Sequence, residues 1–226
     1  MIIGAVVAEL LSCNRIDPRI EKGTINLTLG DFKRARKNFE AVVDKQPSSY
    51  AARLGLGKAM LQELSGNPGD SMLLFDCLTQ LEAARTLRPD REVEKLLGIV
   101  WFKRASMLLA NRDTLSSITA LSRSISLDPS ASKPVNLAGI LYFYRGETAK
   151  ALNLFRLVTT IDSGSASGYF NAGMVHWADS NYTLAFDCWC KAALRAPGDK
   201  EILTWAAMAK QRLKPAPMIS DVKKGR

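Results

Sequence analysis

The chain has 226 residues, of which 47% are hydrophobic and 23% charged, a composition typical of globular proteins rather than disordered or fibrous ones. It contains no apolar run near the roughly 18 residues that a membrane-spanning helix needs, so we expect no transmembrane helix. The net charge is +9, but residues 210–226 alone carry six basic side chains against one acidic. More than half of the excess therefore lies in this segment, and the rest of the chain lacks the charge expected of a nucleic-acid-binding surface.

Residues 1–15 allow two interpretations. The stretch Leu10–Cys13 resembles a bacterial lipoprotein cleavage box, and lipidation of Cys13 would anchor the chain to a membrane. However, no Lys or Arg precedes Arg15, and Glu9 lies beside the box, whereas a secretory signal begins with positive charge. Apolar residues also recur at helical spacing, namely Ile3, Val6, Leu10 and Cys13. We therefore expect a packed N-terminal helix in a cytoplasmic protein, with a membrane-anchored lipoprotein that assists an envelope assembly as the alternative.

From residue 16 onward, one spacing of small and large residues recurs about every 34 residues. Starting at Gly139, an alanine follows after twelve residues, a large side chain four residues later, and a helix-ending position eight residues after that. The same spacing begins at Gly23 and at Gly173. Two further units fit if insertions near 64–71 and 106–113 are allowed. The predicted repeats are 16–49, 50–90, 91–131, 132–165 and 166–198.

Each repeat contains two apolar stripes at helical spacing around a turn, which predicts a helical hairpin. Gly30 and Gly146 lie at such turns, where a left-handed residue can end the first helix. Glycines such as Gly139 lie inside first helices, where each costs about 1 kcal/mol relative to alanine. We therefore expect them to allow close packing of the paired helix. Asp17–Pro18 reads as an N-cap followed by proline at the first helical position.

After the repeats, residues 199–213 read as an amphipathic helix that caps the last hairpin, with Asp199 at its N-cap. Residues 214–226 read as a flexible basic tail.

This arrangement resembles the tetratricopeptide repeat, whose signature is W-x2-L-G-x2-Y, then A-x3-F, then P. The resemblance rests on LAGILYFYRGETAKALNLF (137–155), NAGMVHWADSNYTLAFDCWCKAALRAP (171–197) and GTINLTLGDFKRARKNFEAVVDKQP (23–47). Cys77 and Ser117 depart from the pattern, since they replace its small alanine in the two lengthened hairpins. The resemblance implies an all-α, right-handed superhelix (solenoid) of five hairpins with a C-terminal capping helix, because single hairpins cannot bury their apolar faces alone.

The resemblance also implies a non-catalytic scaffold or adaptor that binds a partner peptide or helix in a concave groove and supports a larger assembly. The repeat register places apolar and aromatic residues on the groove side of the first helices: Phe102, Ile140, Phe143, Tyr144, Phe170, Met174 and Trp177. Aromatic side chains are enriched at binding hot spots. The alternative, that Phe143, Phe170 and Trp177 only pack between helices, stays open at this point.

Some members of the family grip a terminal carboxylate with lysine, asparagine and arginine side chains. At the matching places only the asparagines Asn136 and Asn171 fit, so we expect no such clamp. We expect instead a protein partner that offers an apolar or amphipathic segment.

Signals for catalysis are absent from the sequence. It has one histidine, His176, and no phosphate loop, metal-ligand spacing or serine elbow, so we expect no cofactor, no metal and no small-molecule substrate. His176 lies where the repeat usually holds a large packing residue. Because His176 and Cys188 share one hairpin, a thiol-dependent enzyme or regulator is the alternative from another class.

Overall fold

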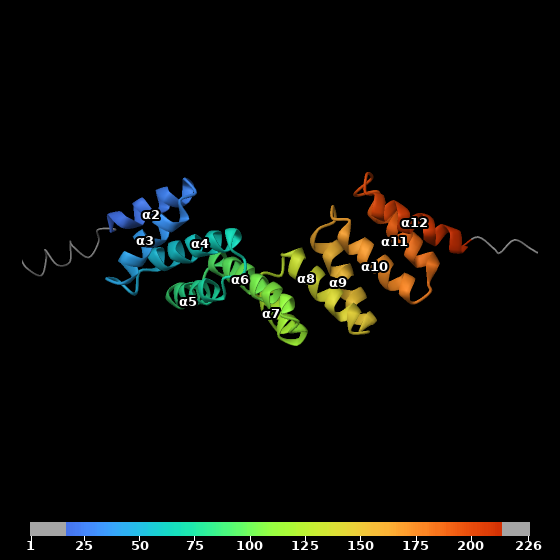
Figure 1. The fold of residues 1–226 in the computed structure, drawn as a ribbon, viewed down its shortest axis with the longest axis horizontal. Helices are drawn as coiled ribbons and strands as arrows, with labels where there is room; N and C mark the ends of the chain where they lie inside the picture. Colours follow the sequence, from blue (N-terminus) through green and yellow to red (C-terminus); the bar gives the residue numbers. More distant parts are fainter. Residues whose placement is uncertain (1–16, 214–226) are drawn as a thin grey trace, which may run out of the picture. The chain divides into compact units, whose positions relative to one another are not determined.

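The computed structural model describes residues 17–213, in which every regular element is an α-helix (Figure 1). The helices are α2 (Pro18–Thr28), α3 (Phe32–Val43), α4 (Tyr50–Gly66), α5 (Ser71–Leu87), α6 (Arg91–Ala110), α7 (Thr114–Leu127), α8 (Ser132–Tyr144), α9 (Thr148–Ile161), α10 (Ser167–Ala178), α11 (Tyr182–Ala193) and α12 (Lys200–Leu213). The expected all-α class of consecutive helical hairpins with a final single helix is confirmed. Among these helices, none combines the length and the apolarity needed to cross a bilayer.

Residues 1–16 and 214–226 lie outside the described part of the chain. The expectations of an N-terminal helix or signal in residues 1–15, of lipidation at Cys13 and of a flexible tail therefore fall outside the described residues.

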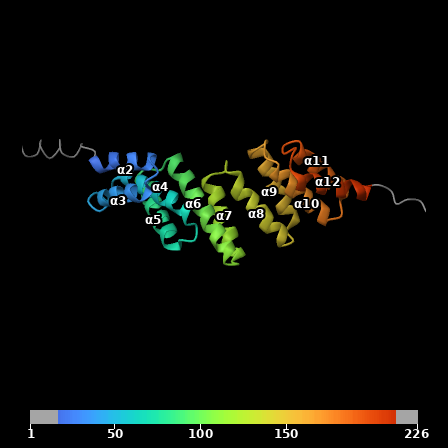
Figure 2. The ribbon, with the colours of Figure 1, turned by 45° about the horizontal axis from the view of Figure 1, so that its top comes forward.

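The helices pair in chain order, α2 with α3 through to α10 with α11, and α12 packs on α11. Figure 2, turned from the first view, again shows the two helices of each hairpin side by side. The chain divides into two compact units, an N-terminal one that ends at Asp128 and a C-terminal one that begins at Pro129. The hairpins α2–α3, α4–α5 and α6–α7 belong to the first, and α8 to α12 belong to the second.

Helix starts follow from short polar side chains that accept hydrogen bonds from the first turn. Asp17 accepts from the amide of Arg19 and precedes Pro18, so the predicted cap and first-turn proline are confirmed. Asp199 accepts from the amides of Glu201 and Ile202 at 2.9 and 3.2 Å. These caps satisfy amides that have no partner inside the helix.

The predicted turn glycines are confirmed in their backbone conformation. Gly30 and Gly146 have φ angles of 76° and 78°. Two other hairpins place non-glycine residues in the same left-handed region, Arg112 at 63° and Ser180 at 60°. A side chain in this region is strained by about 1 kcal/mol or more.

Glycines inside first helices allow the paired helix to approach closely, as predicted. A Cβ atom at Gly139 would lie 2.6 Å from the ring of Phe155, and one at Gly173 would lie 2.5 Å from Nε1 of Trp189. Gly98 differs, because its nearest contact would be Cβ of Asp128 at 3.3 Å. The lengthened third hairpin therefore has a different helix register.

The two insertions extend helices rather than loops. Helices α4 and α5 have 17 residues each and α6 has 20, compared with 11 and 12 in α2 and α3. The residues that replace the small alanine in these hairpins bond to the paired helix. Cys77 Sγ donates to the carbonyl of Gly57 at 3.4 Å, and Ser117 Oγ donates to that of Ala105 at 2.9 Å. Both side chains are buried, so these bonds satisfy their polar groups.

Candidate protein-interaction surfaces

Helices α8 and α10, the first helices of two consecutive hairpins, present a mixed aromatic and polar surface within the C-terminal unit. We call it the α8–α10 face and define it by Asn136, Ile140, Phe143, Tyr144, Phe170, Asn171, Met174 and Trp177. Six of the seven predicted binding residues belong to it. The two helices contact each other directly.

The α8 part of this face has one highly exposed aromatic residue. Tyr144 is 81% exposed, and its ring centroid lies 5.8 Å from that of Phe143. Phe143 and Ile140 are half-buried and pack on a cluster that contains Phe155 and Val175. The α8 side therefore combines an accessible ring with neighbours that the core holds in place.

The α10 part of the face rests on a cluster of aromatic rings. Phe170, Met174 and Trp177 are half-buried against a cluster that contains Trp189. The Trp177 ring lies 4.9 Å from Tyr182 and 5.7 Å from Trp205, measured between centroids. Trp177 thus packs between helices and keeps part of its surface accessible.

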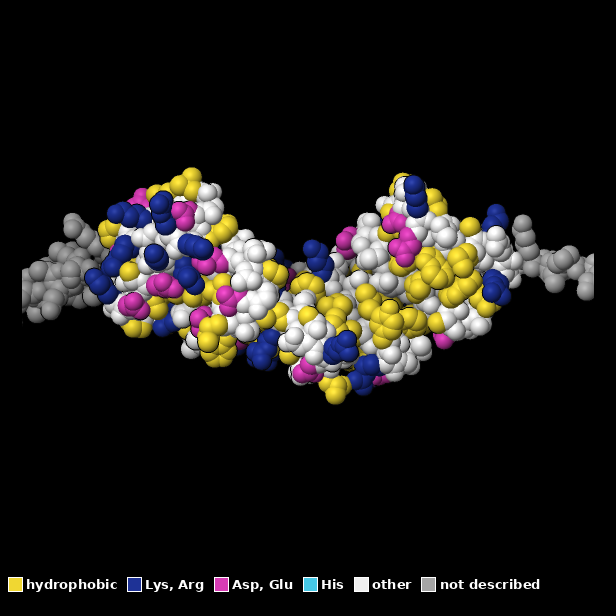
Figure 3. Space-filling model, in the orientation of Figure 1, with side chains coloured by type: hydrophobic (Ala, Val, Ile, Leu, Met, Phe, Trp, Pro, Cys, Tyr) yellow, Lys and Arg dark blue, Asp and Glu magenta, His cyan; other side chains and the backbone are white. Residues whose placement is uncertain are grey.

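In the space-filling view, hydrophobic side chains gather over α10, α11 and α12 (Figure 3). In the same view, charged side chains are scattered over the N-terminal unit. An apolar surface of this kind is a common feature of protein interaction sites.

The seventh predicted residue, Phe102, is not brought together with the others inside one unit. It lies on α6 of the N-terminal unit, where it is half-buried. The described C-terminal unit therefore carries the candidate face by itself.

Two amides connect the helices at the centre of the face. Asn171 Nδ2 donates to Asn136 Oδ1 at 2.8 Å. This bond uses one N–H of the Asn171 side chain and one acceptor position of the Asn136 oxygen. The side-chain NH2 of Asn136 and the side-chain oxygen of Asn171 can therefore bond to other polar groups. The pair can therefore offer both a donor and an acceptor to a peptide group.

Two residues next to this face were not among the binding residues predicted from the sequence. Lys133 is exposed one turn before Asn136 on α8. Trp205 of α12 extends the aromatic surface, with its ring centroid 5.3 Å from that of Trp189. The repeat register carries a signal for Trp205, because α12 continues the series of first helices and Trp205 lies 34 positions after Asn171.

A hollow of about 280 Å³ lies between α9 and α11, and we call it the α9–α11 pocket. It is lined by Leu152, Phe155, Arg156, Thr159, Gly168, Tyr169, Ala172, His176, Cys188 and Lys191. The structure therefore brings His176 and Cys188 to the same pocket. Burial raises the pKa of the Cys188 thiol, with the nearby Asp187 carboxylate adding to the effect. This shift is opposite to the one that activates a nucleophilic cysteine.

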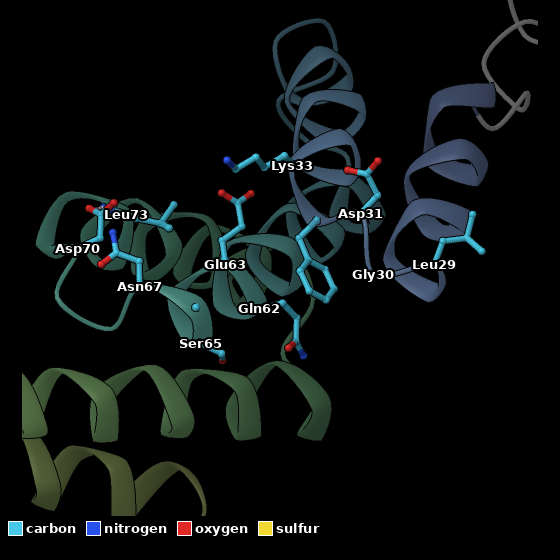
Figure 4. A pocket seen from close by; sticks show the side chains of 12 residues that line it. Leu29, Gly30, Asp31, Lys33, Gln62, Glu63, Ser65, Asn67, Asp70 and Leu73 are labelled. Carbon is cyan, nitrogen blue, oxygen red and sulfur yellow. Dashed lines mark hydrogen bonds between the residues drawn. The ribbon is translucent and has the colours of Figure 1, made fainter.

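The N-terminal unit has a larger open hollow of about 960 Å³, at the end of the lengthened second hairpin (Figure 4). It forms where α4 and α5 extend past the α2–α3 turn. Figure 4 shows Lys33 and Glu63 reaching into the same space. Glu63 Oε1 lies 3.3 Å from Arg36 Nε, and Asp31 and Asp70 accept hydrogen bonds from the first turns of α3 and α5. These carboxylates therefore already have structural partners.

A smaller hollow of about 220 Å³ lies between α5 and α6 of the N-terminal unit. Phe75 lines it and is 63% exposed.

In the described part of the chain, no group of three or more His, Cys, Asp or Glu residues is arranged to hold a metal ion.

Comparison with known proteins gives one family and a set of similar folds. A family model described as tetratricopeptide repeat matches residues 20–75. The crystal structure of MamA is similar, with a TM-score of 0.55 and 22% identity over 77% of this chain and 94% of that one. YrrB, described as a TPR protein with an unusual peptide-binding site, has a TM-score of 0.57 and 18% identity over 90% and 97% of the two chains.

A third similar structure is the first TPR of Spaghetti bound to an HSP90 peptide. It has a TM-score of 0.50 and 14% identity over 53% of this chain and 94% of that one. No curated protein sequence matches the chain. At these identities the solved structures establish a shared fold.

Proposed function

Since this chain is a tetratricopeptide repeat protein, by its fold and by its sequence over residues 20–75, we propose that it is an interaction scaffold whose α8–α10 face binds an apolar or amphipathic segment of a partner protein. Proteins with this repeat are generally non-catalytic. The observation that carries the proposal is the exposure of the Tyr144 ring beside half-buried apolar residues on two adjacent first helices.

Three features support this face over the rest of the surface. The exposed Tyr144 ring offers a large contact area at a low cost in conformational entropy, which favours a hot spot. The Asn136–Asn171 pair can bond to a peptide group of the bound segment. Two neighbours in fold, YrrB and Spaghetti, are described with a peptide-binding site and a bound peptide, respectively.

The test compares two residues of equal exposure. Tyr144 and Leu194 are both 81% exposed, but Leu194 lies outside the face, just after α11. A partner is captured from an extract of the native host with the unaltered chain, and its binding segment is then synthesised. We expect Tyr144→Ala to weaken binding of that segment by about thirtyfold, as for a hot spot of about 2 kcal/mol, and Leu194→Ala to leave it within about twofold. Equal affinities of both variants would show that the partner binds elsewhere.

A further inference from the structure

The C-terminal unit has a second concave site on another side of α10. Spacings of three and four residues place Phe170, Met174 and Trp177 along one side of this helix. Tyr169, Ala172 and His176 lie along another and line the α9–α11 pocket. One helix therefore contributes to two separate surfaces of the same compact unit.

The interior of the α9–α11 pocket is apolar and small. Leu152, Phe155 and Ala172 contribute hydrophobic atoms from α9 and α10. A volume of about 280 Å³ is just below the range of pockets that hold whole drug-sized ligands, roughly 300 to 1,000 Å³. It is large enough for one bulky side chain of a partner.

Positive charge surrounds this interior. Arg156 and Lys191 line the pocket from α9 and α11. The Arg195 guanidinium stacks on the Tyr169 ring at 4.2 Å from its centroid, and Tyr169 is itself a lining residue. Within α9, α10 and α11, Asp187 is the single acidic residue, and its carboxylate lies 2.6 Å from the Lys191 ammonium. An anionic partner would therefore complement the charge around the pocket.

We propose that the α9–α11 pocket docks an acidic segment of a partner protein through one large apolar side chain. The side chain fills the apolar interior, and the flanking carboxylates lie near Arg156, Lys191 and Arg195. This docking site does not depend on the α8–α10 face. A chain with both sites can hold two partners on one unit, which gives a scaffold a direct way to bring them together.

The probe for the first test is the fluorescein-labelled peptide Glu-Glu-Phe-Glu-Glu, whose binding to the full chain is followed by fluorescence anisotropy at low salt. We expect the Arg156→Gln and Lys191→Gln changes together to weaken binding by about tenfold, from two partly exposed charge pairs. Lys150→Gln is the matched control, because Lys150 is also paired with a carboxylate at 2.6 Å but does not line the pocket. Replacing Phe by Ala in the probe should weaken binding by about tenfold or more.

The second test uses the pocket's own thiol. In a chain with Cys13→Ser and Cys190→Ser, Cys188 is the accessible thiol, since Cys77 is buried. The probe should slow modification of Cys188 by N-ethylmaleimide at least threefold, and a chain already modified at Cys188 should lose probe binding. This second test leaves all the charged residues around the pocket unaltered.

Several outcomes would overturn the proposal. They are equal binding of the Phe and Ala probes, equal behaviour of the double variant and Lys150→Gln, or no binding at 1 mM probe. Probe binding that is lost with Tyr144→Ala but kept after modification of Cys188 would place the peptide on the α8–α10 face. In that case this proposal fails while the proposed function stands.

Discussion

Asn171 of α10 donates a hydrogen bond to Asn136 of α8, and this 2.8 Å contact joins the first helices of two hairpins. We expect Asn171→Ala to remove it and lower the free energy of unfolding of the C-terminal unit by about 1 kcal/mol, because the pair is partly buried. Chemical denaturation followed by tryptophan fluorescence measures the change.

The same substitution separates a binding role from a structural one. If the amides bond to a partner's peptide groups, Asn136→Ala and Asn171→Ala should each lower the affinity for the partner segment by about fivefold to tenfold. The measurement is made under conditions where both variants are fully folded. Unchanged affinity would leave the pair with a structural role alone.

Close helix packing predicts different outcomes for alanine substitutions of two glycines at corresponding repeat positions. Gly173→Ala would bring a Cβ to 2.5 Å from Trp189, so we expect a loss of about 1 to 3 kcal/mol of stability from overpacking. Gly98→Ala would place a Cβ 3.3 Å from Cβ of Asp128, a much milder contact that the gain in helix propensity offsets, so we expect its stability to stay within about 1 kcal/mol of the unaltered chain. Urea unfolding of both variants checks the difference. A Gly173→Ala chain as stable as the unaltered one would contradict the packing that the structure shows.

The hairpin turns offer a second matched pair. Ser180 has a φ of 60°, and we expect Ser180→Gly to stabilise the C-terminal unit by up to about 1 kcal/mol, since glycine relieves the left-handed strain. Gly146 has a φ of 78° in the preceding hairpin, so Gly146→Ala should destabilise by about 1 kcal/mol or more. The midpoint temperatures of thermal unfolding of the two variants should shift in opposite directions from that of the unaltered chain.

A titratable contact joins the second and third hairpins. The Tyr50 hydroxyl donates to the Asp90 carboxylate, and this bond, together with the amide of Val93, lowers the pKa of Asp90 from 3.8 to about 2. A lowered pKa in the folded state means that the stabilisation is complete above about pH 3.8 and is lost as the pH falls through about 2. In Tyr50→Phe the pKa of Asp90 should rise, so the loss begins at a higher pH.

Carbon-13 NMR titration of the Asp90 carboxyl group measures this shift directly. Arg88, whose guanidinium stacks on the Tyr50 ring at 3.8 Å, also helps to keep the pKa low. Arg88→Gln should therefore give a smaller rise than Tyr50→Phe. An unchanged titration in Tyr50→Phe would show that the hydroxyl does not bond to Asp90 in solution.

The repeating pattern was sufficient to predict the helices and their turns because it records local requirements. A glycine at the end of a first helix, such as Gly146, indicates a turn with a left-handed backbone conformation. A glycine opposite Phe155 indicates that the two helices of the hairpin pack closely. Both signals depend on residues within one hairpin. The same reasoning gave six apolar or aromatic positions that the structure brings to one unit.

The register of the third hairpin could not be predicted in the same way. The spacing indicated an insertion near the turn, but in the structure Gly98 faces Asp128 and Ser124. The Ser124 hydroxyl donates to the carbonyl oxygen of Gly98 at 2.7 Å. Two serines that donate to the paired helix hold this alternative pairing, and a pattern of apolar residues does not record such polar bonds.

The exposure of the aromatic residues was also beyond the pattern. Phe143 and Trp177 lie 34 positions apart and are both half-buried, whereas Tyr144, the next residue after Phe143, is exposed. The position that corresponds to Tyr144 in the next repeat holds Ala178, which is also exposed. The repeat register therefore identified the side of each first helix, but not how much of each ring the neighbouring helices cover.

Three of the four tryptophans, Trp177, Trp189 and Trp205, lie within one cluster of the C-terminal unit, and the fourth, Trp101, lies on α6. Ring centroids 5.3 to 5.8 Å apart are close enough for their electronic transitions to couple. The chain therefore contains its own optical probe, because near-ultraviolet circular dichroism from the coupled indoles will report on the C-terminal unit. Trp101 is the one tryptophan of the described N-terminal unit, so in a Trp101→Phe chain all indole signals come from the C-terminal unit.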